Sequence, residues 1–161
     1  MNPWIGIIGT VFGALIGGGI VLLNTRLQMN RQKDRERQKL LLEKLEELHE
    51  IISQLRQAYG DLFLMTIDEK GSMIKERISV PTEKLQMLVG FYAPSLSVRL
   101  ENVEMYRAEY DRVLFDWVHA QNQDDKTKKS ALAVTSMWKQ RLDQACTEMQ
   151  TEVIALSKKY I

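Results

Sequence analysis

The stretch from Trp4 to Leu23 limits this chain more than any other feature, because twenty consecutive residues carry no charge. Thr10 is the only polar side chain within it. A helix of this length rises about 30 Å, which matches the hydrocarbon core of a bilayer. Asn2 suits an N-cap and Pro3 a first helical turn, where the missing N–H of proline is no loss. The sequence therefore predicts a transmembrane helix within residues 1–25.

Two other interpretations of this stretch fit the residues less well. A cleavable signal peptide carries Lys or Arg before its apolar run and a small-x-small cleavage site after it, and the sequence shows neither feature. A buried helix of a soluble domain seldom stays uncharged over such a length while it contains six glycines. We therefore expect the helix to be retained as a membrane span.

Four glycines of this stretch, Gly6, Gly9, Gly13 and Gly17, fall on one face of a helix. Glycine costs about 1 kcal/mol of helix propensity relative to alanine in water, so a plain anchor would favour leucine. Without side chains at this spacing, two helix backbones approach closely and gain dispersion and Cα–H···O contacts. We predict that the span self-associates through these glycines. The alternative is a helix that merely tolerates them.

Residues 26–40 form a basic juxtamembrane segment. All charged residues of the chain lie from Arg26 onward. The positive-inside rule places the C-terminal body in the cytoplasm and the N-terminus outside, with the span in the inner (plasma) membrane. The cations of this segment are expected to contact anionic lipid headgroups, at about 1 kcal/mol each. They are Arg26, Arg31, Lys33, Arg35, Arg37 and Lys39.

Residues 41–161 carry the periodicity of a helical bundle and no alternating β pattern of useful length. Their first apolar stripe advances by steps of four and three residues over three heptads. Further helices are predicted from about Pro81, from Pro94 or Ser95 to Ala120, and from Lys128 to Tyr160, with a turn at 68–72 and a polar loop at 121–127. The predicted fold class is all-α: an N-terminal transmembrane helix that continues into a cytoplasmic bundle of about four helices.

The predicted core positions follow from this periodicity on each helix. They are Leu41, Leu45, Leu48, Ile52, Leu55, Tyr59 and Leu62 on the first, Leu85, Leu88 and Val89 on the second, Leu96, Leu100, Val103, Tyr110, Leu114 and Trp117 on the third, and Leu142, Cys146, Met149, Val153, Leu156 and Tyr160 on the fourth.

The sequence lacks the motifs of common enzyme classes. No HExxH, GxSxG, CxxC or phosphate-binding loop occurs, and one cysteine with two histidines leaves too few ligands for most zinc and haem sites. Cys146 is expected in the core, His49 at an exposed position, and Asp124 and Asp125 at a solvated helix cap. We therefore expect no enzyme activity, no metal site and no cofactor.

Arg112 and His119 are the one candidate pair of catalytic residues in the sequence. Six residues separate them, which returns both to one helix face, away from the core stripe. An arginine and a histidine that meet across two protomers can stabilise a phosphate and transfer protons. The alternative is a pair of solvated side chains, with Asp116 as the ion-pair partner of Arg112.

This spacing resembles the RX4–6H motif of HEPN domains, which are small helical bundles that often cleave RNA. Val113 departs from the polar residue that usually follows the arginine. With Gly9, Gly13, Gly17 and its overall layout, the chain resembles the membrane-anchored HEPN-like accessory proteins of type VI-B CRISPR systems. That resemblance implies a cytoplasmic ring of protomers and a membrane pore formed by the single spans.

The expected function is that of a self-associating single-pass membrane protein, a pore-forming or membrane-perturbing effector in bacterial antiviral defence. Its partners would be membrane lipid, further copies of the chain and a protein bound by the cytoplasmic bundle. Two alternatives stay open: a non-enzymatic membrane-tethered scaffold that binds a protein partner, and a HEPN-like ribonuclease. A net charge of +1 gives no general attraction for nucleic acid, which is not an expected partner.

Overall fold

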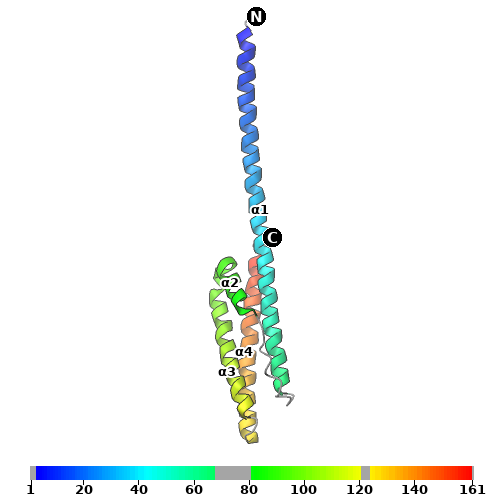
Figure 1. Cartoon of the computed structure of the whole chain (residues 1–161), viewed down its shortest axis with the longest axis vertical. Coiled ribbons are helices and arrows are strands. Elements are labelled where there is room, and N and C mark those ends of the chain that lie inside the picture. Colours follow the sequence, from blue (N-terminus) through cyan, green and yellow to red (C-terminus); the bar gives the residue numbers. More distant parts are fainter. Residues whose placement is uncertain (1–2, 68–80, 121–123, 161) are drawn as a thin grey trace. The chain divides into compact units, whose positions relative to one another are not determined.

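The chain folds into α-helices. The structure is a computed structural model that describes the backbone of residues 3–67, 81–120 and 124–160, and their side chains from residue 21 onward except 22, 65–67 and 120. Its elements are α1 (Pro3–Ile67), α2 (Thr82–Tyr92), the 3₁₀ turn η1 (Pro94–Leu96), α3 (Ser97–Ala120) and α4 (Asp125–Ser157), as Figure 1 shows. No strand occurs in these ranges, which confirms the all-α class. The turn predicted at 68–72 lies outside the described residues.

The chain divides into two units, Met1–Leu40 and Leu41–Ile161. In the first unit, every side chain that is described, from Val21 to Leu40, is exposed. Across the part of the chain whose side chains are described, no helix has both the length and the hydrophobicity needed to cross a membrane. The predicted span Trp4–Leu23 and its four glycines lie outside that part, apart from Val21 and Leu23.

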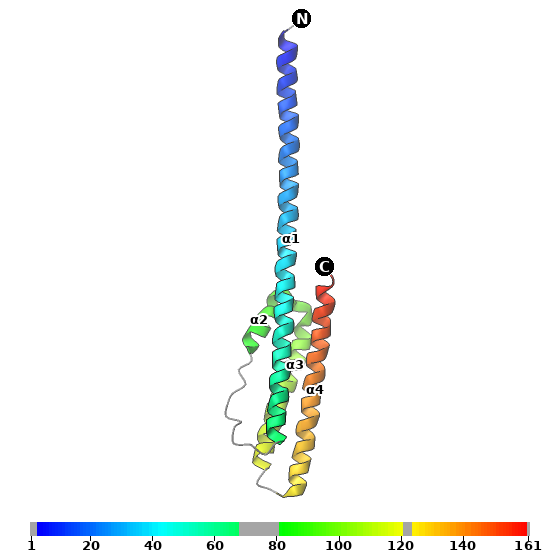
Figure 2. The same cartoon turned by 90° about the vertical axis from the view of Figure 1, so that its right-hand side faces the viewer.

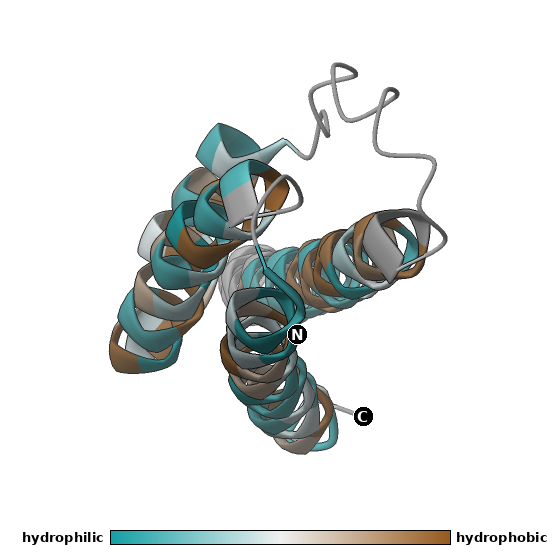
Figure 3. Cartoon of the chain, turned by 90° about the horizontal axis from the view of Figure 1, so that it is seen from below, coloured by the Kyte–Doolittle hydropathy of each residue, from teal (hydrophilic) through white to brown (hydrophobic). Residues whose placement is uncertain are grey.

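The second unit is built around one hydrophobic core. The predicted stripe of α1 is confirmed from Leu45 to Tyr59, and Leu41 and Leu62 pack against its two ends half-buried. Ile51 widens this stripe, because it lies beside Ile52 and is also buried. The end-on view in Figure 3 shows α1, α3 and α4 set around a common centre, where their apolar stripes meet. Burial of these stripes, rather than helix propensity alone, therefore holds the helices of this unit in place.

The corner between α2 and α3 lies at Ala93, directly before Pro94, where the sequence predicts that the next helical segment begins. The N–H of Ala93 donates to the carbonyl of Val89 at 3.1 Å and ends α2. Pro94 then begins η1, which leads directly into α3. The side chains of Leu85, Leu88 and Val89 are all buried, as are the six predicted core positions from Leu96 to Trp117.

Helices α3 and α4 form an antiparallel pair that both Figure 1 and Figure 2 show side by side. Helix α4 begins at Asp125, three residues earlier than predicted, so residues 125–127 are helical and not part of a loop. Asp124 is the N-cap residue, and its carboxylate accepts a hydrogen bond from the Thr127 hydroxyl. The helix begins directly after Asp124, whose extended backbone (φ −68°, ψ 159°) is typical of an N-cap position.

The C-terminal end of the predicted α4 stripe is wrong at one position. Leu142, Cys146, Met149 and Val153 are buried, and Leu156 packs against the core half-buried. Tyr160 is exposed and lies beyond the last helical residue, Ser157. The chain turns there through hydrogen bonds from the N–H groups of residues 158–160, so the stripe no longer continues at helical spacing.

Polar contacts tie the helices together around the core. The Tyr59 hydroxyl of α1 donates to the Asp111 carboxylate of α3 at 3.2 Å, and the Gln150 amide of α4 donates to the Ser53 hydroxyl of α1 at 2.7 Å. Lys84 of α2 pairs with Glu47 of α1. Each contact joins residues that are far apart in sequence and fixes which helix faces which.

Candidate functional site

The predicted pair Arg112 and His119 lies on the solvent face of α3. The Arg112 side chain keeps 66% of its accessible surface and donates from Nε and Nη2 to Glu109 Oε2, at 3.0 and 2.6 Å. Its ion-pair partner is therefore Glu109, three residues earlier, and not Asp116. This hydrogen bond to Glu109 is also the main reason why the pKa of Arg112 is raised.

His119 makes its contacts within the same helix. Its Nδ1 lies 2.9 Å from the carbonyl oxygen of Phe115, and its ring lies 4.1 Å from the Phe115 ring, centroid to centroid. No interaction between Arg112 and His119 occurs among the described residues. The structure thus places both on the face that the sequence predicted, each with a local partner of its own.

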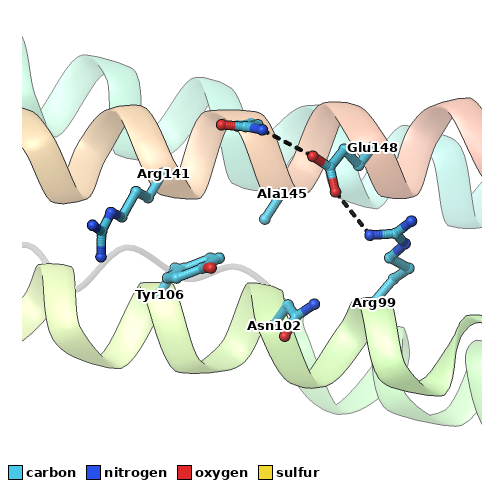
Figure 4. A pocket seen from close by; sticks show the side chains of 7 residues that line it. Arg99, Asn102, Tyr106, Arg141, Ala145 and Glu148 are labelled. Carbon is cyan, nitrogen blue, oxygen red and sulfur yellow. Dashed lines mark hydrogen bonds and ion pairs between the residues drawn. The ribbon is translucent and has the colours of Figure 1, made fainter.

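A polar cleft between α3 and α4 was not predicted from the sequence. It has a volume of about 400 Å³ and is lined by Arg99, Asn102 and Tyr106 of α3 and by Arg141, Gln144, Ala145 and Glu148 of α4. Figure 4 shows these side chains between the two helices, with Arg99 and Arg141 toward opposite ends. The signal was present in the spacing, because residues 99, 102 and 106 and residues 141, 145 and 148 each recur at helical steps on adjacent antiparallel helices.

One end of this cleft is an ion-pair network. Arg99 donates from Nη1 to Glu148 at 2.8 Å and from Nε to Glu152 at 2.7 Å, and Gln144 donates to the other oxygen of Glu148 at 3.0 Å. The hydrogen bond to Glu152 is the largest cause of the raised pKa of Arg99. Two carboxylates therefore compensate this guanidinium.

The other end of the cleft is aromatic and cationic. The Arg141 guanidinium lies 4.8 Å from the centroid of the Trp138 ring, within the range of a cation–π interaction. Tyr106 packs against the same tryptophan, with ring centroids 6.1 Å apart. Within the described ranges, no carboxylate forms an ion pair with Arg141.

A second, smaller groove of about 290 Å³ lies between α1 and α4 and includes Ser53, Arg56, Gln57, Lys139 and Asp143. Lys139 pairs with Asp143, and Ser53 already accepts the hydrogen bond from α4. The Lys139–Asp143 pair lies within α4, whereas the hydrogen bond to Ser53 joins α4 to α1, so several polar groups of this groove already have partners. No group of His, Cys, Asp and Glu residues suited to a metal ion occurs in the described part of the chain.

Of the remaining predicted residues, Cys146 and Asp124 lie where the sequence predicted, and His49 does not. Cys146 is buried as expected, and burial raises the pKa of its thiol to about 12. Asp124 is exposed at a helix cap, also as expected, and the Thr127 hydroxyl is the main reason why its pKa is lowered. His49 is half-buried and not exposed, because it lies one turn beyond buried Leu45, on the flank of the core stripe.

The predicted headgroup-binding cations lie in the first unit, within α1. Arg26, Arg31, Lys33, Arg35, Arg37 and Lys39 are all exposed. Within the described residues, none of these cations forms an ion pair in the chain. Their positive charges are thus available to an anionic surface.

The solvent side of α3 carries exposed apolar side chains that are not part of the predicted core. Val98, Met105 and Phe115 keep 65%, 50% and 64% of their accessible surface. Together with exposed Ala108 they recur along one side of the helix that points away from the core. We call these four residues the outer α3 face. Exposed Glu101 and Arg112 lie on the same side of the helix, so this face carries apolar side chains set between charged ones.

Comparison of this chain with protein families, with curated proteins and with solved structures finds no match in any of the three.

Proposed function

We propose that this chain is a single-pass membrane protein that self-associates through its N-terminal span and carries a cytoplasmic helical bundle. The observation that carries the proposal is the make-up of α1. This one helix, Pro3–Ile67, contains the uncharged stretch, then the basic segment, and then the first core stripe of the bundle. That order is typical of an anchor, its membrane-proximal charges and a cytoplasmic domain.

The physical basis of self-association is the glycine spacing. Gly6, Gly9, Gly13 and Gly17 leave one side of the helix without side chains, so that a second backbone can approach closely. The uncharged stretch offers no pore-lining charge, so a channel would need several copies around a lumen lined by glycine and Thr10. Together with the resemblance given above, this favours a membrane-perturbing effector of bacterial antiviral defence.

The test is the mass of the detergent-solubilised protein, measured by light scattering for the wild type and for Gly13→Leu. We expect a discrete assembly of the wild type and a smaller species for the variant, because a leucine side chain keeps the backbones apart. Gly19→Leu is the matched control, since residue 19 points roughly a third of a turn away from residue 13. A wild-type monomer, or equal masses for all three proteins, would contradict self-association through this face.

Membrane perturbation has a separate test. Cells that express the chain should take up a membrane-impermeant dye, and Gly13→Leu should abolish the uptake while Gly19→Leu retains it. If dye uptake is the same with and without the protein, the proposed effector activity is contradicted, whereas the proposed membrane anchor is not.

The outer α3 face favours a second candidate function, that of a membrane-tethered scaffold. Here a protein partner would cover Val98, Met105 and Phe115, and the span would only hold the bundle at the membrane. Replacing residues 1–25 with an unrelated span would then preserve function, whereas Phe115→Glu would remove it. Under the first proposal, the span replacement is the change that removes function.

A further inference from the structure

The two arginines of the α3–α4 cleft differ in how their charges are compensated. Arg99 is held by Glu148 and Glu152, at 2.8 and 2.7 Å. Arg141 faces only the Trp138 ring, 4.8 Å from its centroid, and has no ion-pair partner among the described residues. An anion that enters the cleft would therefore bind at the Arg141 end, where a guanidinium offers two parallel donors to a phosphate or carboxylate.

The middle of the cleft has room for a flat group. Tyr106 of α3 lies across from Ala145 of α4, and Figure 4 shows the tyrosine ring between the two helices. Both residues line the cleft, and the alanine side chain that faces the ring ends at Cβ. Trp138 supports the tyrosine from the side, with ring centroids 6.1 Å apart. A planar ring that stacks on Tyr106 would be stabilised there, as bases are on aromatic side chains.

Hydrogen-bonding groups line the same space. Asn102 projects into the cleft and makes no side-chain hydrogen bond among the described residues, so both its donors and its acceptor are open to a ligand. Gln144 lines the opposite wall and donates to Glu148. Amides of this kind recognise the edges of nucleobases, which present donors and acceptors side by side.

We propose that the α3–α4 cleft binds a mononucleotide, with its phosphate on Arg141, its base against Tyr106 and the base edge toward Asn102. The volume of about 400 Å³ lies within the range of small-molecule sites. A divalent cation fits poorly, because the one carboxylate in the lining, Glu148, is already bound to Arg99. The site belongs to the bundle and does not rest on the proposed membrane function.

Binding in this cleft would also act on the bundle itself. The ligand would contact α3 through Tyr106 and Asn102 and α4 through Arg141, so it would join the two helices that form the antiparallel pair. A ligand that binds the folded state alone stabilises that state by mass action. The bundle could thus respond to a nucleotide with a change in stability.

The test is calorimetric titration of the full-length protein in detergent with adenosine monophosphate, with inorganic phosphate and adenosine titrated separately. We expect binding of the nucleotide and binding at least about tenfold weaker for each of its two parts, because only the nucleotide fills both the cationic end and the aromatic middle. No heat with the nucleotide would overturn the proposal. Phosphate that binds as tightly as the nucleotide would overturn the role of Tyr106 and with it the assignment of a nucleotide.

Two variants locate the site. Arg141→Ala should weaken nucleotide binding by about tenfold or more, and Arg141→Lys should recover part of the loss, because lysine keeps the charge but not the paired donors. Arg112→Ala is the matched control, as an exposed arginine on the solvent face of α3. An equal loss for Arg112→Ala and Arg141→Ala would show that binding follows overall charge, and would overturn the assignment to the cleft. All variants carry exposed substitutions, and circular dichroism verifies their helicity.

Discussion

The two parts of helix α1 share one backbone conformation and differ in what surrounds their side chains. From Val21 to Leu40 every described side chain is exposed, including Leu27, Met29 and Leu40. From Leu45 to Tyr59 the apolar side chains are buried against three other helices. Most of the stability of a helix in a protein comes from packing of its apolar face rather than from helix propensity. Packing in the bundle therefore stabilises the second part of α1, whereas the described side chains of the first part make no such packing contacts; we propose that lipid and further copies surround it.

The largest effect on the free energy of unfolding is expected from a leucine-to-alanine substitution in the buried part of α1, compared with the same substitution in the exposed part. Leu48→Ala removes a side chain that is 1% exposed, and should lower the free energy of unfolding by about 2–5 kcal/mol through lost burial and the cavity left behind. Leu40→Ala, at a side chain that is 46% exposed, should lower it by less than about 1 kcal/mol. Urea denaturation followed by circular dichroism measures both, and equal losses would show that residues 21–40 are packed as firmly as the bundle.

The rate of thiol labelling should also differ between the buried core and the exposed part of α1. Because burial raises the pKa of Cys146 to about 12, its thiolate population at neutral pH is roughly a thousandfold below that of an ordinary cysteine. Maleimide labelling of the native protein should therefore be very slow and should become fast in urea. A cysteine introduced by Gln38→Cys, at an exposed position of α1, should label at the rate of a free thiol. Rapid labelling of wild-type Cys146 without denaturant would show that the bundle opens.

The contact between α1 and α3 should depend on pH. Partial burial raises the pKa of the Asp111 carboxyl above its ordinary value, although the Tyr59 hydroxyl that donates to it acts in the opposite direction. The folded chain thus favours the protonated carboxyl, so the contribution of this group to stability is complete only below its ordinary pKa and is lost as pH rises through the raised one.

Asp111→Asn therefore should increase the unfolding midpoint at pH 7, and the difference from the wild type should shrink toward pH 3. Denaturation curves at the two pH values give the measurement, with Asp116→Asn on the same helix as the control. A stabilisation by Asp111→Asn that is larger at pH 3 than at pH 7 would contradict the sign of this argument.

The smallest effect is expected at the exposed pair. Arg112→Ala and His119→Ala should leave the unfolding midpoint unchanged, because both side chains contact only their own helix. A fluorescent RNA incubated with the wild type or with either variant should stay intact. Cleavage by the wild type that both variants lose would instead support the HEPN-like ribonuclease.

Much of the bundle could be predicted because its core positions recur at helical spacing. Two rows of buried side chains are enough to define two helices and the faces that pack. They are the stripe from Leu45 to Tyr59 and the row of Leu142, Cys146, Met149 and Val153. Periodicity also predicted Tyr160 in the core, and failed there, because it contains no information on where a helix ends. The start at Asp125 directly follows the extended N-cap residue Asp124, which lies outside the apolar stripe, so the spacing of apolar residues does not reveal it.

The cleft was harder to predict than the core because it depends on pairing between helices. Arg99 and Arg141 are ordinary surface arginines in the sequence, and only the antiparallel packing of α3 and α4 brings them to one cleft. Glu148 and Glu152 compensate the charge of Arg99, and no carboxylate among the described residues does so for Arg141. This difference depends on side-chain geometry. The Arg112 and His119 pair, in contrast, was correctly placed on one face, because both residues belong to one helix.

The contact between Ser53 and Gln150 has a consequence for the time course of synthesis. These two residues are 97 positions apart in the chain, so the contacts of α1, the first helix of the bundle, form only after α4, the last helix, has been synthesised. A ribosome adds about 5–20 residues per second, so the apolar stripe of α1 waits several seconds for α4 to emerge. Helices α3 and α4 follow one another along the chain and can pair before α1 joins them. The first stripe of the nascent chain therefore stays without its α4 partner during that interval.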